Sequence, residues 1–169
     1  VQGPLDFCGE PVPLAEPDVR ERLEKELLTT IWNRPQTILW LKRAGRHLPY
    51  IEAELRRNEM PSDLKYMAII ESALLPHIGS NKGARGFWQF IDPTATRFGM
   101  TVNSDIDERR SLPHSTRAAI AYLKALYADL HSWTLAAAAY NMGEEGLKSE
   151  ILVQNTNDYY RLYLPLETQ

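Results

Sequence analysis

Apolar residues recur along this chain at the three- and four-residue spacing of amphipathic helices, and no stretch alternates for long enough to predict a sheet. Val19, Leu23, Leu27 and Ile31 follow Pro17 at this spacing, so we expect a helix from about Pro17. The same pattern, divided by prolines and glycines, predicts further helices over residues 35–46, 49–57, 62–75, 92–99, 113–130 and 135–142. A mainly α fold class follows.

The helix predicted over residues 62–75, with Ser62 as its N-cap, carries an acid on its apolar face. Leu64, Met67, Glu71 and Leu74 fall on one side of it. A carboxyl buried there without a partner would hold its proton at neutral pH, as a general acid requires. Alternatively, Glu71 lies at the edge of the stripe and pairs with an arginine. Position alone favours this structural interpretation.

Bulky aromatic residues surround Gln89 in the sequence Gly86-Phe87-Trp88-Gln89-Phe90, which follows a glycine-containing loop. The loop lacks the pattern of a phosphate-binding loop and no strand precedes it. Aromatic faces beside amides are typical of sugar-binding clefts, but they are also typical of helical cores. For Phe87 and Phe90 we favour the core.

Composition narrows the classes of function. The chain has 169 residues, enough for one domain with a real core, and its 19 basic and 22 acidic residues give a net charge of −3, so we do not expect nucleic-acid binding. Its apolar runs are too short for a membrane-spanning segment. Cys8 is the only cysteine, which leaves a structural thiol, favoured here, or a lipid-attachment site.

The histidines carry no recognisable catalytic arrangement, and neither a Ser-His-Asp pattern nor an HExxH zinc motif is present, so we expect no metal and no cofactor. Two hypotheses from the residues remain open. The first is a helical glycan-cleaving enzyme with Glu71 as its acid. The second is a helical module that binds carbohydrate or protein without chemistry.

The sequence contains four separated motifs, which follow one another along the chain. They are Glu71-Ser72, then Ser80 with Gly83-Ala84-Arg85-Gly86-Phe87-Trp88-Gln89-Phe90, then Thr94-Ala95 with Phe98-Gly99, and finally Ala138-Ala139-Tyr140-Asn141-Met142-Gly143. Together they resemble the lytic transglycosylase domain of the murein transglycosylases, in particular the type D pattern. The clear match covers residues 58–165, and residues 1–57 match more loosely.

This resemblance implies a lysozyme-like helical catalytic domain over residues 58–169, with residues 1–57 as an arm and helical extension packed on it. It implies cleavage of the β-1,4 bond between N-acetylmuramic acid and N-acetylglucosamine in peptidoglycan glycan strands. The product would end in a 1,6-anhydro sugar, which makes the enzyme a lyase. A cell-wall substrate implies the bacterial envelope, in the periplasm. Additional peptidoglycan-binding modules would lie outside this fragment.

The resemblance also assigns roles to residues. Glu71 is the catalytic acid and then base. Ser80 and Gln89 line the cleft and bind the acetamido region of the substrate, while Tyr140 points its hydroxyl at Glu71. Asn141 belongs to the same motif and supports the helix end or the shell behind the site.

Ser72 and Phe90 are expected to support this site. Asp92, Asp105 and Asp107 are candidates for a second carboxylate, which we reject because Asp92 is expected to cap a helix and Asp107 to form an ion-pair corner with its neighbours. Glu144 and Glu145 are expected on a solvated face. A muramidase that uses water is the alternative enzyme.

The sequence departs from the family at one place. Ile91-Asp92 stands where the family usually has Met-Pro, whose methionine packs against a bound sugar.

Overall fold

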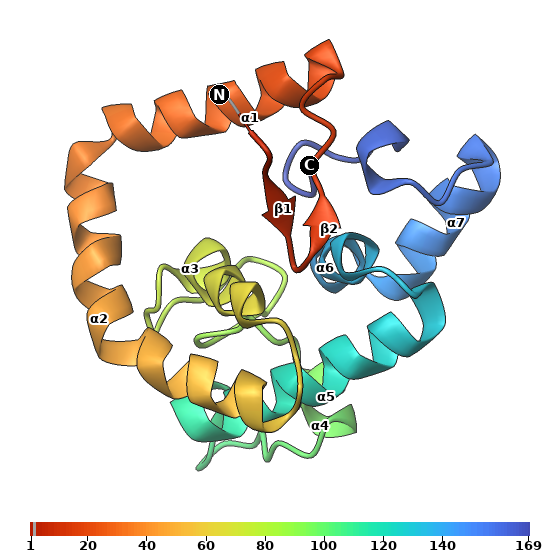
Figure 1. Cartoon of the computed structure of the whole chain (residues 1–169). Coiled ribbons are helices and arrows are strands. Elements are labelled where there is room, and N and C mark those ends of the chain that lie inside the picture. The colour runs from red at the N-terminus through yellow and green to blue at the C-terminus, as the bar shows by residue number, and fades with distance from the viewer. Residues whose placement is uncertain (2) are drawn as a thin grey trace. The chain divides into compact units, whose positions relative to one another are not determined.

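The computed structural model describes residue 1 and residues 3–169. Its described part is mainly α, which confirms the predicted fold class (Figure 1). The α-helices are α1 (Pro17–Trp32), α2 (Arg34–Arg57), α3 (Met67–Ser72), α4 (Asp92–Arg97), α5 (Leu112–Leu130), α6 (Trp133–Met142) and α7 (Glu144–Gln154). Two-residue strands β1 (Asp6–Phe7) and β2 (Glu10–Pro11) and three 3₁₀ helices, Ser62–Tyr66, Glu108–Arg110 and Tyr159–Arg161, complete the order.

The chain divides into two compact units. The terminal unit combines Val1–Trp32 with Leu123–Gln169, and the central unit is Asn33–Tyr122. Helix α5 runs from one unit into the other. No helix among the described residues has the length and apolar character needed to cross a bilayer.

In the terminal unit, β1 and β2 form a hairpin whose turn is Cys8-Gly9, both at positive φ. Helix α6 contains four consecutive alanines, residues 136–139, and three of them, Ala136, Ala138 and Ala139, are buried. The side chain of Ser132 caps α6 by accepting from the backbone N–H of Leu135, so the helix begins at Trp133, before the predicted start at residue 135. Helix α7 packs against α6 and was not predicted, because it lacks a clear apolar stripe.

In the central unit, α2 replaces the two helices predicted over residues 35–46 and 49–57. Pro49 lies inside this single helix. A proline removes one backbone donor and so forfeits one helical hydrogen bond, but the bonds on either side carry the helix through it. Ile51 and Leu55, after the proline, are fully buried.

The structure also differs from the prediction at the start of two helices and at the end of one. Residues 62–75 form a 3₁₀ helix followed by the short α3, which ends at Ser72 because Ala73 and Leu74 adopt left-handed conformations. The side chain of Ser62 makes no capping hydrogen bond. Asp92 lies in the first turn of α4 instead of capping it, and the cap position belongs to Ile91.

Candidate functional site

Glu71 lies in the last turn of α3, in the central unit, on the side of the chain that faces the core. Leu64, Met67 and Leu74 are buried around this face, as the spacing predicts. A residue of α2 stabilises the end of this helix: Nη1 of Arg43 donates to the carbonyl oxygen of Ala73 at 3.1 Å. A cation at a helix C-terminus is favourable. The backbone that follows Glu71 is thereby fixed by a neighbouring helix.

The Glu71 carboxyl group is half-buried, and no hydrogen bond or ion pair joins it to another described residue of the central unit. The arginine-paired alternative is therefore not what this unit shows. Burial disfavours the charged form and raises the pKa of Glu71 to about 7. At neutral pH the group is divided between its acid and its base forms. This division suits a group that gives a proton and then takes one back.

Ser72 joins α3 to the aromatic segment. Its hydroxyl is buried and donates to the carbonyl oxygen of Phe87 at 2.8 Å, with the carbonyl of Ala68 as a second acceptor at 3.1 Å. A nucleophilic role is not indicated, because the hydroxyl proton is engaged by backbone carbonyls. The bond instead fixes the spacing between the helix of Glu71 and the segment that carries Gln89.

Gln89 sits in a left-handed backbone conformation, with a φ of 48°. Its Nε2 donates to the carbonyl oxygens of Ile78, at 3.2 Å, and Gly86, at 2.8 Å. The side chain thus closes the two ends of the loop over residues 78–86. Its Oε1 is left to accept from another group.

Ser80 lies in the same loop and is exposed. Its Oγ accepts from the backbone N–H groups of Lys82 and Ala84, both at 3.2 Å. These bonds hold the loop in a tight turn and leave the hydroxyl proton free of them. The structure therefore places Ser72, Ser80 and Gln89, with Glu71, in one unit and gives each of the three a defined local anchor.

The aromatic residues of the segment lie in the core. Phe87 and Phe90 are buried, as the core interpretation predicts. Phe87 meets the ring of His47 edge-on at 5.2 Å, and Phe90 lies 6.3 Å from the ring of Tyr122. Trp88 is fully buried, and its Nε1 donates to Oγ1 of Thr116 at 3.1 Å. These buried aromatic side chains anchor the loop to the core.

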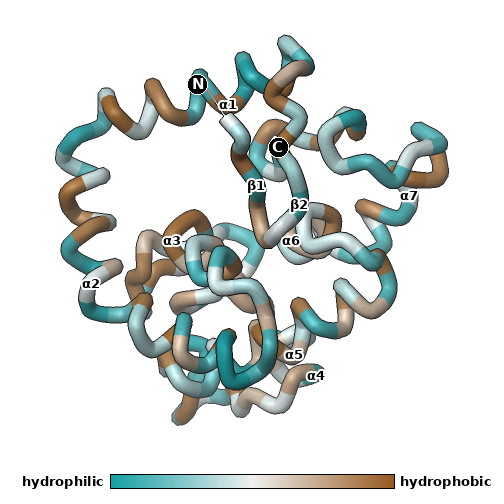
Figure 2. The backbone as a smooth tube through the Cα atoms, in the orientation of Figure 1, coloured by the Kyte–Doolittle hydropathy of each residue, from teal (hydrophilic) through white to brown (hydrophobic). Residues whose placement is uncertain are grey.

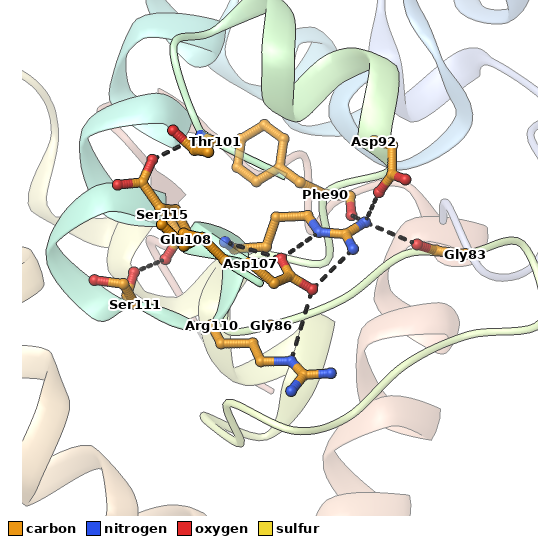
Figure 3. A network of polar contacts seen from close by, with 12 residues as sticks. Gly83, Gly86, Phe90, Asp92, Thr101, Asp107, Glu108, Arg110, Ser111 and Ser115 are labelled. Carbon is orange, nitrogen blue, oxygen red and sulfur yellow. Dashed lines mark hydrogen bonds and ion pairs between the residues drawn. The ribbon is translucent and has the colours of Figure 1, made fainter. Parts of the chain in front are cut away.

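A network of polar contacts that includes Gly83, Phe90 and Asp92 supports this loop (Figure 3). Its central residue is Arg109. It is only 4% exposed, and its guanidinium binds Asp107 through Nε and Nη2 at 2.8 and 2.9 Å. Its Nη1 pairs with Asp92 and donates to the carbonyl oxygens of Gly83 and Phe90, at 3.1 and 3.3 Å. This hydrogen bonding holds the pKa of Asp107 below its usual range.

The backbone of the loop also touches this network directly. Gly86 has a φ of 82°, and a Cβ at this position would lie 1.8 Å from the carbonyl oxygen of Arg109. The ion-pair corner expected from Asp107 is confirmed, while the capping role of Asp92 is replaced by its pairing with Arg109. The sequence indicated the corner but not that its arginine supports the loop of Ser80 and Gln89.

A hollow of about 430 Å³ lies beside the network. It is lined by residues 102–107 together with Arg85, Asp92, Arg109 and Arg110. Glu71, Ser80 and Gln89 do not line it. Asp105 does, and its backbone N–H donates to Oδ1 of Asn103 in a tight turn.

The fourth motif lies in the terminal unit. Tyr140 and Asn141 occupy the last turn of α6, which Gly143 ends with a φ of 92°. Oδ1 of Asn141 accepts from the hydroxyl of Thr168 at 2.8 Å. Asn141 is therefore tied to the C-terminal segment, while the hydroxyl orientation expected for Tyr140 stays a prediction.

The other end of α6 is held by Glu10, a residue that sequence analysis did not single out. Its carboxylate accepts from the N–H of Thr134 at 3.0 Å, from the N–H of Trp133, and from the hydroxyls of Ser132 and Thr134 at 2.9 and 2.7 Å. Helix N-termini attract carboxylates. No local pattern links Glu10 to residues more than 120 positions later, so the sequence offered no signal for this contact.

Comparison with known proteins places these motifs in one family. The transglycosylase SLT domain model matches residues 49–162. The chain is 30% identical over 171 residues to the membrane-bound lytic murein transglycosylase D of Escherichia coli K12 and to its counterpart in strain O6:H1, covering 96% of this chain. It is also 34% identical over 110 residues to a putative tributyltin chloride resistance protein of Alteromonas sp. strain M-1, covering 63% of this chain and 53% of that protein.

The chain spans 37% of the length of the two E. coli relatives. The family match itself covers well over half of this chain and contains Glu71, the loop of Ser80 and Gln89, the Arg109 network and Tyr140-Asn141. This chain belongs to the transglycosylase SLT domain family, whose domains are lysozyme-like and helical.

Proposed function

We propose that this chain is a peptidoglycan lytic transglycosylase that uses Glu71 as its single catalytic acid and base. The proposal rests above all on one observation: a half-buried carboxyl, without an ion-pair partner in its unit and with a pKa of about 7, lies within the residues that the family model matches. The E. coli relatives are named for the same activity on murein.

In the first step, protonated Glu71 gives its proton to the oxygen that links N-acetylmuramic acid to N-acetylglucosamine. The bond between that oxygen and the anomeric carbon of the muramic acid breaks, and positive charge develops on the sugar. The substrate's own N-acetyl group assists by forming an oxazolinium ion. A general acid with a pKa near the working pH serves this step best.

In the second step, the 6-hydroxyl oxygen of the same muramic acid attacks its anomeric carbon, and Glu71, now ionised, takes the hydroxyl proton. The products are a 1,6-anhydromuramic acid and a free N-acetylglucosamine hydroxyl, and no water is consumed. Most glycosidases need a second carboxylate as nucleophile or base. Here the substrate carries the nucleophile, in keeping with Asp92 and Asp107 both being paired with Arg109.

The remaining motif residues would bind and orient the glycan. Ser80 would use its free hydroxyl proton, and Gln89 its free amide oxygen, on the acetamido region of the substrate. Tyr140 would hold Glu71 in position, and Asn141 would support the end of α6. Ser72 and Phe90 would support the site from behind. In this proposal residues 58–169 form the catalytic domain and residues 1–57 an extension packed on it.

The proposed substrate implies the bacterial envelope, with the periplasm as the compartment, and the relatives named as membrane-bound are consistent with that location. Peptidoglycan strands are the partner. Additional peptidoglycan-binding modules would belong to a longer protein.

The test is digestion of purified peptidoglycan in water enriched in ¹⁸O, followed by mass spectrometry of the muropeptides. A lyase gives anhydro products, one water lighter than reducing ends and free of ¹⁸O. A muramidase gives reducing ends that carry ¹⁸O, which would contradict the proposed reaction. Binding without any cleavage would indicate a non-catalytic module.

Glu71→Gln keeps the shape of the side chain but cannot donate and accept a proton, so we expect loss of cleavage with the fold retained. Glu145→Gln is a matched control, since it makes the same change at an exposed acid just beyond the fourth motif. Full activity of the Glu71→Gln variant would overturn the assignment.

A further inference from the structure

The first half of α2 exposes apolar side chains to solvent. Ile38 is 53% exposed and Leu41 is 68% exposed. A helical turn separates these two residues, so both lie on one side of the helix. Figure 2 shows hydrophobic positions along this part of α2. The sequence predicts a helix over residues 35–46, and the structure leaves this side of it exposed.

Cationic side chains share that side. Arg34, Lys42 and Arg46 fall four residues before Ile38 and four and eight residues after it, which places them along the same face. All three are exposed, and none forms an ion pair with a described residue. We call this surface, made by Arg34, Ile38, Leu41, Lys42 and Arg46, the α2 face.

The charge around this face differs from that of the chain as a whole. Residues 27–51 contain four arginines and lysines and no acid, although the chain carries a net charge of −3. The fourth cation, Arg43, is turned to the carbonyl oxygen of Ala73 and stays off the face. The positive charge is therefore concentrated where the apolar side chains are exposed.

The residues that precede α2 in the sequence are also apolar and exposed. In the terminal unit, Ile31 and Trp32 at the end of α1 are 63% and 91% exposed, and Leu28 is 66% exposed. A tryptophan this exposed is uncommon away from interfaces, because its ring is both large and amphipathic. Trp32 is two residues from Arg34 along the chain.

We propose that the α2 face binds the surface of an anionic phospholipid bilayer. A row of unpaired cations attracts the lipid headgroups, while Ile38 and Leu41 enter the boundary of the acyl chains. Lysine and arginine stems can lie along such a boundary with their charges in the headgroup layer.

The charge pattern argues against a second copy of this chain as the occupant. A two-fold symmetric pair would bring Arg34, Lys42 and Arg46 of each molecule against the same cations of the other, and like charges across an interface disfavour association. A lipid surface offers negative charge to all three cations at once.

The experiment measures co-sedimentation of the whole 169-residue chain with vesicles of phosphatidylcholine alone and with vesicles that also contain phosphatidylglycerol. We expect binding only to the second kind, weaker as salt is raised. Lys42→Gln should weaken it about fivefold, and Arg34→Gln with Lys42→Gln about 25-fold. Ile38→Ser with Leu41→Ser should weaken it by about tenfold or more.

Leu152→Ser with Val153→Ser is the matched control. These residues are 81% and 77% exposed on α7, close to Glu150, so they offer apolar surface without the cations. Binding should be unchanged in this variant.

Three outcomes would overturn the proposal: no binding to anionic vesicles, equal loss in the α7 control, or α2-face variants that change the oligomeric state in solution and leave vesicle binding intact. The variants should retain full activity on soluble peptidoglycan fragments, since no residue of the α2 face belongs to the proposed catalytic machinery. Failure of lipid binding is thereby distinguished from failure of the proposed function.

Discussion

The hydroxyl of Ser72 donates a hydrogen bond of 2.8 Å to the carbonyl oxygen of Phe87. Ser72 follows the proposed catalytic acid directly, and Phe87 lies two residues before Gln89. One buried hydrogen bond therefore links the first two motifs of the family, although they are separated by a loop with several exposed residues. The position of the acid relative to the loop depends on this bond.

Ser72→Ala removes the bond and leaves the carbonyl oxygen of Phe87 without that donor. A buried acceptor that loses its partner costs about 1–3 kcal/mol of unfolding free energy. We expect a lower midpoint in urea unfolding and a reduced kcat on peptidoglycan. Ser111→Ala is the control, because it removes a half-buried hydroxyl of the same unit, far from the first motif in the sequence. Unchanged stability in Ser72→Ala would contradict a linking role.

The raised pKa of Glu71 has a consequence for stability. The folded state holds this proton with a pKa of about 7, above the ordinary value of 4.5, so the folded chain binds the proton more tightly than the unfolded chain does. The contribution of the group to stability is complete below about pH 4.5 and is lost as the pH rises through about 7.

Glu71→Gln should therefore stabilise the protein at pH 8 by about 3 kcal/mol and leave its stability at pH 4 nearly unchanged. Urea unfolding at the two pH values measures the difference. Glu145→Gln, at an exposed position, should show no such dependence. A Glu71→Gln variant that is destabilised at both pH values would mean that the carboxylate has a partner in the folded state.

Gly86 and Gly83 differ in one respect that a substitution can isolate. Both have positive φ, 82° and 81°, but a Cβ on Gly86 would strike the carbonyl of Arg109, whereas one on Gly83 would meet nothing within 4 Å. Gly83→Ala should cost only the backbone strain, about 1–2 kcal/mol. Gly86→Ala should cost more than about 3 kcal/mol, since it also forces the loop away from the Arg109 network. Equal losses in thermal unfolding would show that the close approach contributes nothing.

The sequence predicted the features that depend on local spacing. It placed Glu71 with Leu64, Met67 and Leu74, and all three apolar neighbours are buried. It also predicted a helix over residues 135–142 and the charged corner at Asp107. Helix ends were less well predicted, because Ala73 and Leu74 adopt left-handed conformations that neither residue type favours.

Contacts between distant segments could not be predicted in this way. The pairing of Asp92 with Arg109 depends on how the loop folds back, and no periodicity encodes it. The exposure of Ile38 and Leu41 is a similar case, because a stripe at helical spacing indicates an apolar face but not whether anything covers it. Both features follow from tertiary structure alone.

Glu10 offers the most direct test of such a distant contact. Partial burial on its own would raise the pKa of this carboxyl, but hydrogen bonds from Thr134, Trp133 and Ser132 outweigh it and hold the pKa below the ordinary 4.5. This stabilisation is therefore present above about pH 4.5 and is lost as the pH falls through the lower folded pKa.

Glu10→Gln loses the charge and places an amide donor among backbone donors, so we expect the free energy of unfolding to fall by about 1–2 kcal/mol at pH 7. As the pH falls through the lowered folded pKa, the difference from the unsubstituted chain should shrink, because its own carboxyl becomes protonated. Glu26→Gln, at an exposed acid of α1, is the control. Because Glu10 holds the helix that ends in Tyr140, a variant with normal stability and normal activity would show that the hairpin does not position this motif.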